Sequence, residues 1–227
     1  MPEPKTATSH VYRHVIDYEV EDQILDELAR PGCRVLDVGT GATGRSALKA
    51  HQRGAEVASI EINLSAIAEF GARPDRAGLG LAAADLVSLP FADDVFELVQ
   101  VSLHGFDYVL DEPSRLRGLA EMRRVTRPGG HVVFNAFNPV GLCLSPSGFR
   151  PPMVRTRLAY LARLGFLGST LIDANGLELH QGTVGTITTQ AAEVGLVRQS
   201  VRNLSGTSAS PLVVGLLSSA PYYVFSA

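Results

Sequence analysis

Three glycines and two acids in the first third of the chain have the spacing of a site for a nucleotide-like ligand. Gly39, Gly41 and Gly44 form a G-x-G-x-x-G pattern. Asp37 lies two positions before this pattern, and Glu61 follows Gly39 by 22 residues. Glycines at a strand-to-helix turn let the backbone approach a ligand, and an acid about 20 residues further on can bind a ribose hydroxyl. The pattern predicts a ligand that carries a ribose, and a nicotinamide dinucleotide is one candidate.

The positions of two acids favour a second candidate. A carboxylate at Asp37, directly before the glycines, would repel a pyrophosphate. It suits instead a ligand whose near end carries an ammonium and a sulfonium group, as S-adenosylmethionine does. Asp85, at the end of the third predicted strand, can accept a hydrogen bond from the exocyclic amine of an adenine. These acids favour S-adenosylmethionine, and the dinucleotide stays open as the alternative.

Alternating strands and helices are predicted around these residues. Short β-branched segments precede the glycines and Glu61, and the segments between them have helical periodicity. Strands that alternate with helices form a parallel sheet covered on both faces, with right-handed crossovers. We therefore predict a doubly wound, Rossmann-like α/β fold. The predicted strands are 34–38, 56–61, 79–85, 96–102 and 131–137, and the predicted helices are 12–30, 44–53, 63–72 and 111–125.

The last third of the chain has a looser pattern. Residues 138–185 predict an irregular stretch with one helix at 154–164, and four arginines without any acid lie between positions 145 and 170. This composition favours either a lid over the acceptor or a solvated basic face. A short helix at 187–194 and two strands, at 195–204 and 221–227, are predicted to follow, and these strands can pair antiparallel.

Four motifs in order make the chain resemble a known family. They are the D-x-G-x-G loop at 37–41, the acid at Glu61, the AD-x-x-x-LPF run at 84–91 and the R-x-x-R-PGG turn at 124–130. Over residues 33–137 the chain resembles the class I S-adenosylmethionine-dependent methyltransferases, in particular their small-molecule, methyltransferase type 11-like branch. The resemblance implies a seven-stranded sheet with the order 3-2-1-4-5-7-6 and an antiparallel last strand.

The resemblance also implies which residues contact the cofactor. Asp37, Gly39 and Gly41 are expected around the methionine part, Glu61 at the ribose, and Asp85 with Leu86 at the adenine. Thr40, Ile62, Ser102 and Tyr18 complete the expected set of cofactor-binding residues. The chain departs from the family at Thr43, where a glycine is usual. The glycine comes one residue later, which leaves the contact of Gly44 open.

One side chain after the fourth strand can accept a proton. His104 lies in the segment SLHGFDY, residues 102–108, which by resemblance faces the transferable methyl group. Because imidazole titrates near neutral pH, we predict His104 as the catalytic base, and a structural histidine is the alternative. Asp107 is expected to cap a helix or loop. The implied reaction moves a methyl group from S-adenosylmethionine to an O, N or C atom of a small, largely apolar acceptor and leaves S-adenosylhomocysteine.

The composition restricts the remaining classes of protein. The 227 residues include 20 Lys+Arg and 23 Asp+Glu, and the net charge of −3 argues against broad nucleic-acid binding. Two cysteines without a Cys-x-x-Cys pair argue against a disulfide framework and a metal site. No apolar run approaches the roughly 20 residues of a membrane span. We expect a single cytoplasmic methyltransferase domain with a tail (1–10), an N-terminal helix (11–30), a cofactor-binding core (33–137), a lid or insertion (138–185) and a C-terminal helix with a β-hairpin (186–227).

Two rival functions keep the same fold. A methyltransferase that acts on a macromolecule would need a strongly basic surface or an Asn/Asp-Pro-Pro-Tyr/Phe motif after the fourth strand, where this chain reads SLHG. A non-catalytic ligand-binding module would keep the fold and lose the cofactor acids, yet Asp37, Glu61 and Asp85 are all present. A small-molecule acceptor is therefore the preferred partner, and the sequence leaves the oligomeric state undetermined.

Overall fold

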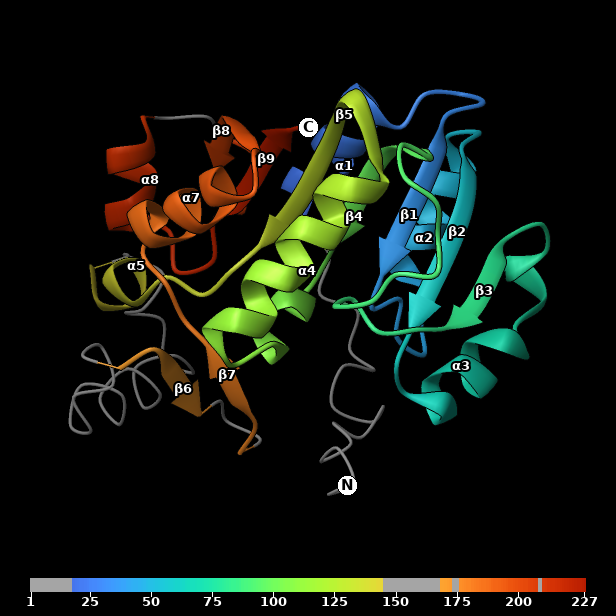
Figure 1. Cartoon of the computed structure of the whole chain (residues 1–227), viewed down its shortest axis with the longest axis horizontal. Helices are drawn as coiled ribbons and strands as arrows, with labels where there is room; N and C mark the ends of the chain where they lie inside the picture. The colour runs from blue at the N-terminus through green and yellow to red at the C-terminus, as the bar shows by residue number, and fades with distance from the viewer. Residues whose placement is uncertain (1–17, 145–167, 173–175, 208–209) are drawn as a thin grey trace.

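The computed structural model describes residues 18–144, 168–172, 176–207 and 210–227. The predicted helix at 154–164, the four arginines between 145 and 170, and the first part of the predicted N-terminal helix lie outside these residues. The described chain is built around one sheet with helices on both faces (Figure 1).

A seven-stranded sheet has the spatial order β3-β2-β1-β4-β5-β9-β8. The first five of these strands are parallel, and β9 runs antiparallel to both of its neighbours. Because β8 and β9 are the sixth and seventh strands of this sheet along the chain, the predicted order 3-2-1-4-5-7-6 and the antiparallel last strand are confirmed. The strands are β1 (Arg34–Val38), β2 (Glu56–Glu61), β3 (Gly80–Ala83), β4 (Phe96–Val101), β5 (Thr126–Asn135), β8 (Val197–Arg202) and β9 (Tyr222–Ser226).

Different helices cover the two faces of the sheet, because successive side chains of a strand point to opposite faces. Leu36 and Phe134 belong to the buried cluster that contains α4 and α7, whereas Val35 and Val224 belong to the cluster that contains α1 and α2. In Figure 1, α4 lies in front of the sheet and α1 and α2 lie behind it. The helices flanking the sheet are α1 (Glu19–Leu28), α2 (Arg45–Gln52), α3 (Leu64–Gly71), α4 (Glu112–Val125) and α7 (Val184–Glu193), with short 3-10 turns η1 (Pro74–Arg76) and η2 (Gly105–Tyr108).

The Pro-Gly-Gly segment at 128–130 differs from its prediction. It was expected as a turn before the fifth strand, but β5 begins at Thr126 and includes it. The pairing with β4 shifts between Phe96↔Thr126 and Leu98↔His131, so one residue of β4 faces four of β5. Gly129 has a φ of +80°, which permits this bulge.

Three short elements beyond β5 were not predicted. They are α5 (Pro139–Leu144), the hairpin of β6 (Thr170–Ile172) with β7 (Glu178–His180), and α8 (Pro211–Leu217). The start signal of α8 is present in the sequence, since Ser210 caps the helix by accepting a hydrogen bond from Val213 N–H and Pro211 follows. Within the described ranges, no helix combines the length and the apolar character that crossing a membrane requires.

Candidate functional site

The glycine loop joins β1 to α2 at the carboxyl edge of the sheet. The N–H groups of Gly39 and Thr40 both donate to the carbonyl of Ile60, at 2.9 and 3.1 Å, and this attaches the loop to the end of β2. Gly39 and Gly41 have φ values of +71° and +63°, and a side chain added at either would meet no atom within 4 Å. One side of the loop is therefore open to a ligand.

Gly44 has a packing role that distinguishes it from the other two glycines. Its φ is +58°, and a Cβ there would come within 2.0 Å of the Phe70 ring. Gly44 therefore lets α2 begin directly beside α3.

Glu61 connects the glycine loop to the turn after β2. Its Oε2 accepts the Gly41 N–H at 2.9 Å, and its Oε1 accepts the N–H groups of Ile62 and Asn63, both at 2.9 Å. Asn63 then caps α3 through its own side chain. The carboxylate is thus held in a fixed place at the carboxyl edge of the sheet.

Asp37 is fully buried at the end of β1. Its Oδ1 accepts hydrogen bonds from Ser46 Oγ at 2.6 Å and Gln100 Nε2 at 3.1 Å, while its Oδ2 has no partner among the described residues. Burial raises the pKa of Asp37, and the nearby side chains of Ser46, Thr40 and Gln100 oppose the rise. A buried carboxylate oxygen without a donor beside an open glycine loop fits a ligand end that carries an ammonium group. Two partners of Asp37 were not predicted: Ser46 in the first turn of α2, and Gln100, which pairs with Asp37 across β1 and β4.

His104 stands beyond the end of β4, in the strained turn that leads into η2. Both Leu103 and His104 have positive φ values, 49° and 63°, which is uncommon for residues with side chains and concentrates at functional sites. The His104 ring stacks on Phe137, with centroids 3.8 Å apart. A side chain on a strained turn is thereby held in one orientation.

The hydrogen bonds of His104 define its tautomer. Its main-chain N–H donates to Asn135 Oδ1 at 2.9 Å, which fixes the orientation of the Asn135 amide. Asn135 Nδ2 then faces His104 Nε2 at 3.3 Å, and Asp107 Oδ2 faces His104 Nδ1 at 3.0 Å. The proton of a neutral ring therefore lies on Nδ1, and Nε2 is the acceptor. Asp107, which the sequence suggested as a cap, is instead fully buried and also accepts the Phe137 N–H at 2.8 Å.

Comparison with known proteins identifies the segment that carries this edge of the sheet. Residues 36–134 match the family model described as Methyltransferase domain. This segment is a methyltransferase domain. It belongs to the type 11 branch of the class I methyltransferases, whose cofactor is S-adenosylmethionine, so the dinucleotide alternative is set aside.

Two curated relatives match the domain in sequence. The demethylmenaquinone methyltransferase of Beutenbergia cavernae is 43% identical over 115 residues, which cover 50% of this chain and 45% of that protein. The ubiquinone/menaquinone biosynthesis C-methyltransferase UbiE of Bordetella avium is 36% identical over 122 residues, 52% of this chain and 46% of that protein. The chain spans about half the length of the curated relatives it matches.

Solved structures share the fold over nearly the whole chain. The CcbJ methyltransferase of Streptomyces caelestis has a TM-score of 0.72 at 15% identity and covers 96% of this chain and 95% of its own. An S-adenosylmethionine-dependent methyltransferase of Mesorhizobium loti has a TM-score of 0.63 at 22% identity, covering 90% and 96%. These likenesses concern the fold.

The other residues that the sequence predicted to bind the cofactor also lie around the carboxyl edge of the sheet. Ala84 N–H donates to the Glu61 carbonyl at 3.1 Å, so Asp85 follows directly beside the end of β2. Asp85 is exposed, and its Oδ1 accepts the Val87 N–H at 3.1 Å. Leu86 packs its side chain into the core, so a ligand can reach only its main chain. Ile62 is 60% exposed.

Ser102 and Tyr18, the last two predicted cofactor-binding residues, come from the end of β4 and from the start of α1. Ser102 is half-buried two residues after Gln100, and its carbonyl accepts the Gly105 N–H. Tyr18 precedes α1 and meets the Tyr222 ring edge-on at 6.2 Å. The Tyr222 hydroxyl donates to Glu21, which pairs with Arg45 at the start of α2. This chain of contacts joins α1 to the glycine loop.

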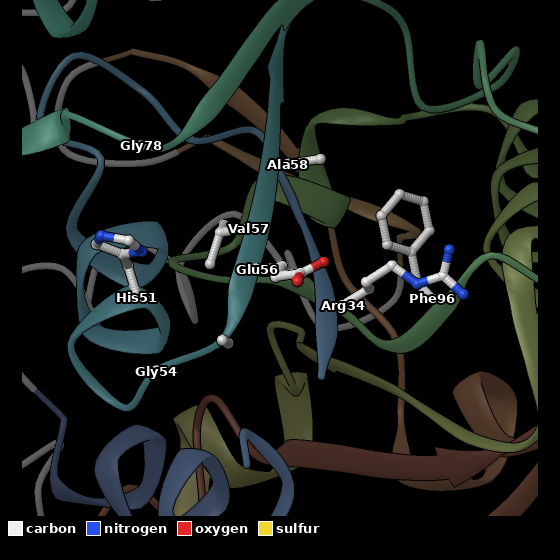
Figure 2. Close-up of a pocket in the computed structure, with 9 residues that line it drawn as sticks. Arg34, His51, Gly54, Glu56, Val57, Ala58, Gly78 and Phe96 are labelled. Carbon is white, nitrogen blue, oxygen red and sulfur yellow. The ribbon is translucent and has the colours of Figure 1, made fainter. Parts of the chain in front are cut away.

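A surface pocket of the methyltransferase domain lies at the other edge of the sheet. Figure 2 shows Arg34, Glu56 and Phe96 around it, the first residues of β1, β2 and β4. These are the amino ends of strands whose carboxyl ends carry the glycine loop, Glu61 and His104. The pocket is therefore separate from the candidate site. Across the described residues, no group of three or more His, Cys, Asp or Glu side chains is arranged to hold a metal ion.

Proposed function

We propose that the protein is an S-adenosylmethionine-dependent C-methyltransferase that acts on the ring of a small hydroquinone. The names of the relatives, demethylmenaquinone methyltransferase and ubiquinone/menaquinone biosynthesis C-methyltransferase, support this acceptor class. The observation that carries the proposal is the juxtaposition, at one sheet edge, of the open glycine loop and the His104 ring, whose Nε2 faces Asn135 Nδ2 at 3.3 Å.

The proposed cofactor contacts follow the edge of the sheet from β4 to β3. Asp37, Gly39, Thr40 and Gly41 surround the methionine end, Glu61 binds the ribose, Ile62, Asp85 and Leu86 border the adenine, and Ser102 and Tyr18 flank the site. The buried Asp37 Oδ2 supports this arrangement because it lacks a donor that an ammonium group would supply.

Glu61 gives the proposal a specific structural consequence. A carboxylate offers about four acceptor positions. Backbone N–H groups of Gly41, Ile62 and Asn63 already donate to Glu61. Binding both ribose hydroxyls therefore releases at least one of these contacts. The bond to Gly41 is the one that crosses from Glu61 to the loop, so we expect the loop to change when the cofactor binds.

The proposed chemistry assigns one proton transfer to His104. When bound, the cofactor would supply a methyl group as an electrophile, so one C–S bond breaks and one C–C bond forms. His104 Nε2 accepts the hydroxyl proton of the hydroquinone, which replaces the Asn135 amide as its donor and makes the neighbouring ring carbon more nucleophilic. After transfer, the C–H bond at that carbon breaks and the oxygen regains a proton, so the acceptor loses one proton in total. Phe137 keeps the imidazole plane fixed, and holding the methyl donor and the acceptor carbon together can account for about 7–11 kcal/mol of barrier lowering.

The described residues of the segment after β5, which are 138–144, 168–172 and 176–185, are proposed to border the acceptor. Its described part returns to His104, because Gly182 N–H donates to the Phe137 carbonyl at 2.9 Å and Phe137 pairs with Gln181. A ligand beside His104 would therefore also meet β7 and the chain around it. We propose this segment as the acceptor-side part of the site.

The experiment is a methylation assay with a 1,4-naphthohydroquinone whose ring carbon next to one hydroxyl bears hydrogen. The expected product carries the new methyl group on that carbon, as shown by mass spectrometry and by loss of the ring proton in NMR. A matched hydroquinone already methylated at that carbon serves as the control and should give no product. Methylation only on oxygen, or turnover of neither compound while S-adenosylhomocysteine binds, would overturn the proposed acceptor.

A further inference from the structure

Asn135 joins the end of β5 to the strained turn that carries His104. It is the last residue of β5, it is fully buried, and its main chain pairs with Tyr222 of β9. Two atoms of its side-chain amide meet the same neighbour. Oδ1 accepts the His104 main-chain N–H at 2.9 Å, and Nδ2 lies 3.3 Å from His104 Nε2. One side chain therefore contacts both the main chain and the ring of His104.

The main-chain contact determines which way the Asn135 amide points. A peptide N–H can only donate a hydrogen bond, so the amide atom that meets it is the oxygen. The nitrogen of the same amide then faces the His104 ring, and it too can only donate. A donor at this position is compatible with an unprotonated Nε2 and opposes a protonated one.

The same contact supports an unfavourable main-chain conformation. Leu103 and His104 both have positive φ values, which residues with a Cβ adopt at a cost. The hydrogen bond from His104 N–H to a buried acceptor stabilises this turn. Because β5 is paired on both sides, with β4 and with β9, its last residue is a fixed point for the turn.

The carboxylate on the other side of the His104 ring has the opposite influence on its charge. Asp107 Oδ2 lies 3.0 Å from Nδ1, and a carboxylate beside an imidazole favours a ring that carries two protons. Arg115 of α4 brings a positive charge near Asp107 and partly balances it. His180 of β7 and Tyr223 of β9 are neutral at neutral pH, because burial lowers the pKa of the histidine to about 4 and raises the pKa of the tyrosine. The donor from Asn135 thus opposes the effect of Asp107.

We propose that Asn135 is a positioning residue that holds His104 in its turn and, by presenting Nδ2 to Nε2, keeps the imidazole neutral until a hydroxyl of the acceptor takes the place of this donor. The consequence for the acceptor rests on the proposed function. The state of the ring before any acceptor binds does not, so it can be measured separately.

The main test is the variant Asn135→Asp. It keeps an acceptor for the His104 main-chain N–H and replaces the donor at Nε2 with a second acceptor. A ring between two carboxylates can donate to both only when each of its nitrogens carries a proton. Nitrogen NMR of histidine-labelled full-length protein with S-adenosylhomocysteine at pH 7 reports both ring nitrogens, and the spectrum of His104→Gln identifies the His104 signals. We expect one protonated nitrogen, Nδ1, in the wild type and two in Asn135→Asp.

Asn203→Asp is the matched control for the change of charge. The Asn203 Oδ1 accepts the N–H groups of Ser205 and Thr207, at 3.1 and 2.9 Å, and a carboxylate can accept both as well. This variant should leave the His104 signals unchanged. Asn135→Ala removes the donor at Nε2 without adding a charge. It should raise the doubly protonated fraction of His104 less than Asn135→Asp does, and it serves as the test if the aspartate variant does not fold.

Single-turnover methylation adds a pH profile that a merely structural role would not change. At pH 7, Asn135→Asp should transfer the methyl group about tenfold more slowly than the wild type, with unchanged affinity for S-adenosylhomocysteine. Its rate should rise toward that of the wild type as the pH is raised to about 9, because the ring then loses its second proton.

Two results would overturn different parts of this account. A singly protonated His104 ring in folded Asn135→Asp, or in folded Asn135→Ala if the aspartate variant does not fold, would overturn the positioning role. A doubly protonated ring in the variant, combined with a wild type that methylates no hydroquinone, would overturn the proposed function and leave the positioning role standing.

Discussion

The cofactor edge at β1 and β2 and the acceptor edge at β4 and β5 are built from different kinds of contact. At the cofactor edge, backbone N–H groups of the glycine loop bond to Ile60 and Glu61, about 20 residues away. At the acceptor edge, His104 depends on Asn135 at the end of β5 and on Phe137 beyond it, more than 30 residues along the chain. The first region is specified by a short motif, and the second by the packing of distant segments.

This difference predicts different consequences of substitution. Changes at the cofactor edge should alter affinity or loop stability through a few local bonds. Changes at the acceptor edge should alter rate, because they disturb the orientation of one imidazole.

The largest effect is expected for His104→Gln. Loss of a proton acceptor lowers the rate of a reaction that needs one by about 10²- to 10⁴-fold, while the cofactor edge keeps its contacts. Single-turnover methylation and a titration with S-adenosylhomocysteine measure the two properties separately. His51→Gln, in the pocket at the opposite edge, is the matched control and should change neither. If the His104→Gln protein keeps its full rate but binds the cofactor more weakly, His104 belongs to the cofactor edge and is not the proton acceptor.

The two glycine positions should differ in stability. Gly44→Ala combines a left-handed backbone with overlap on Phe70, so we expect a loss of about 2–5 kcal/mol in the free energy of unfolding. Gly41→Ala has the same backbone strain and open space, so its loss should be about 1–2 kcal/mol. Urea unfolding measures both. Adding Phe70→Leu to Gly44→Ala should recover part of the loss, and equal losses for the two single variants would contradict the packing role of Gly44.

Lowering the pH should reduce the free energy of unfolding through His180. Its pKa is about 4 in the folded protein and about 6.5 when exposed, so the unfolded chain binds the extra proton first as pH falls. The stability due to the neutral ring is complete above pH 6.5 and is lost between pH 6.5 and 4, by up to about 3 kcal/mol. Urea unfolding at pH 7.5 and pH 5 should show this loss. The difference between the two pH values should shrink in His180→Gln, and an unchanged difference would mean that other groups cause it.

The smallest effect is expected at Glu61. Glu61→Gln keeps the size of the side chain but replaces one acceptor oxygen by an NH2 group and removes the charge, so the affinity for S-adenosylhomocysteine should fall by about 1.5–3 kcal/mol. Calorimetric titration measures it. Glu56→Gln, at the amino end of the same strand, should bind as the wild type does. An unchanged affinity in Glu61→Gln would remove Glu61 from the proposed ribose contact.

The doubly wound sheet and the position of the proposed cofactor contacts at one of its edges could be predicted for a common reason. Regular alternation of strands and helices restricts the topology, and glycines with an acid after the second strand mark the edge where ligands bind in such sheets. The bulge at 127–130 and the hairpin of β6 and β7 escaped prediction, because both depend on pairing with partners far along the chain.

Periodicity in the sequence was enough to predict a doubly wound sheet, and the family motifs added the strand order and the glycine loop, because both depend on residues close together along the chain. The contacts of Asp37 with Ser46 and Gln100, the packing of Gly44 on Phe70 and the burial of Asp107 beside His104 became visible only in the folded chain. Burial is the physical reason. A residue's type says which bonds and charges it can form, but the neighbours that exclude water from it come from segments that only the folded chain brings together.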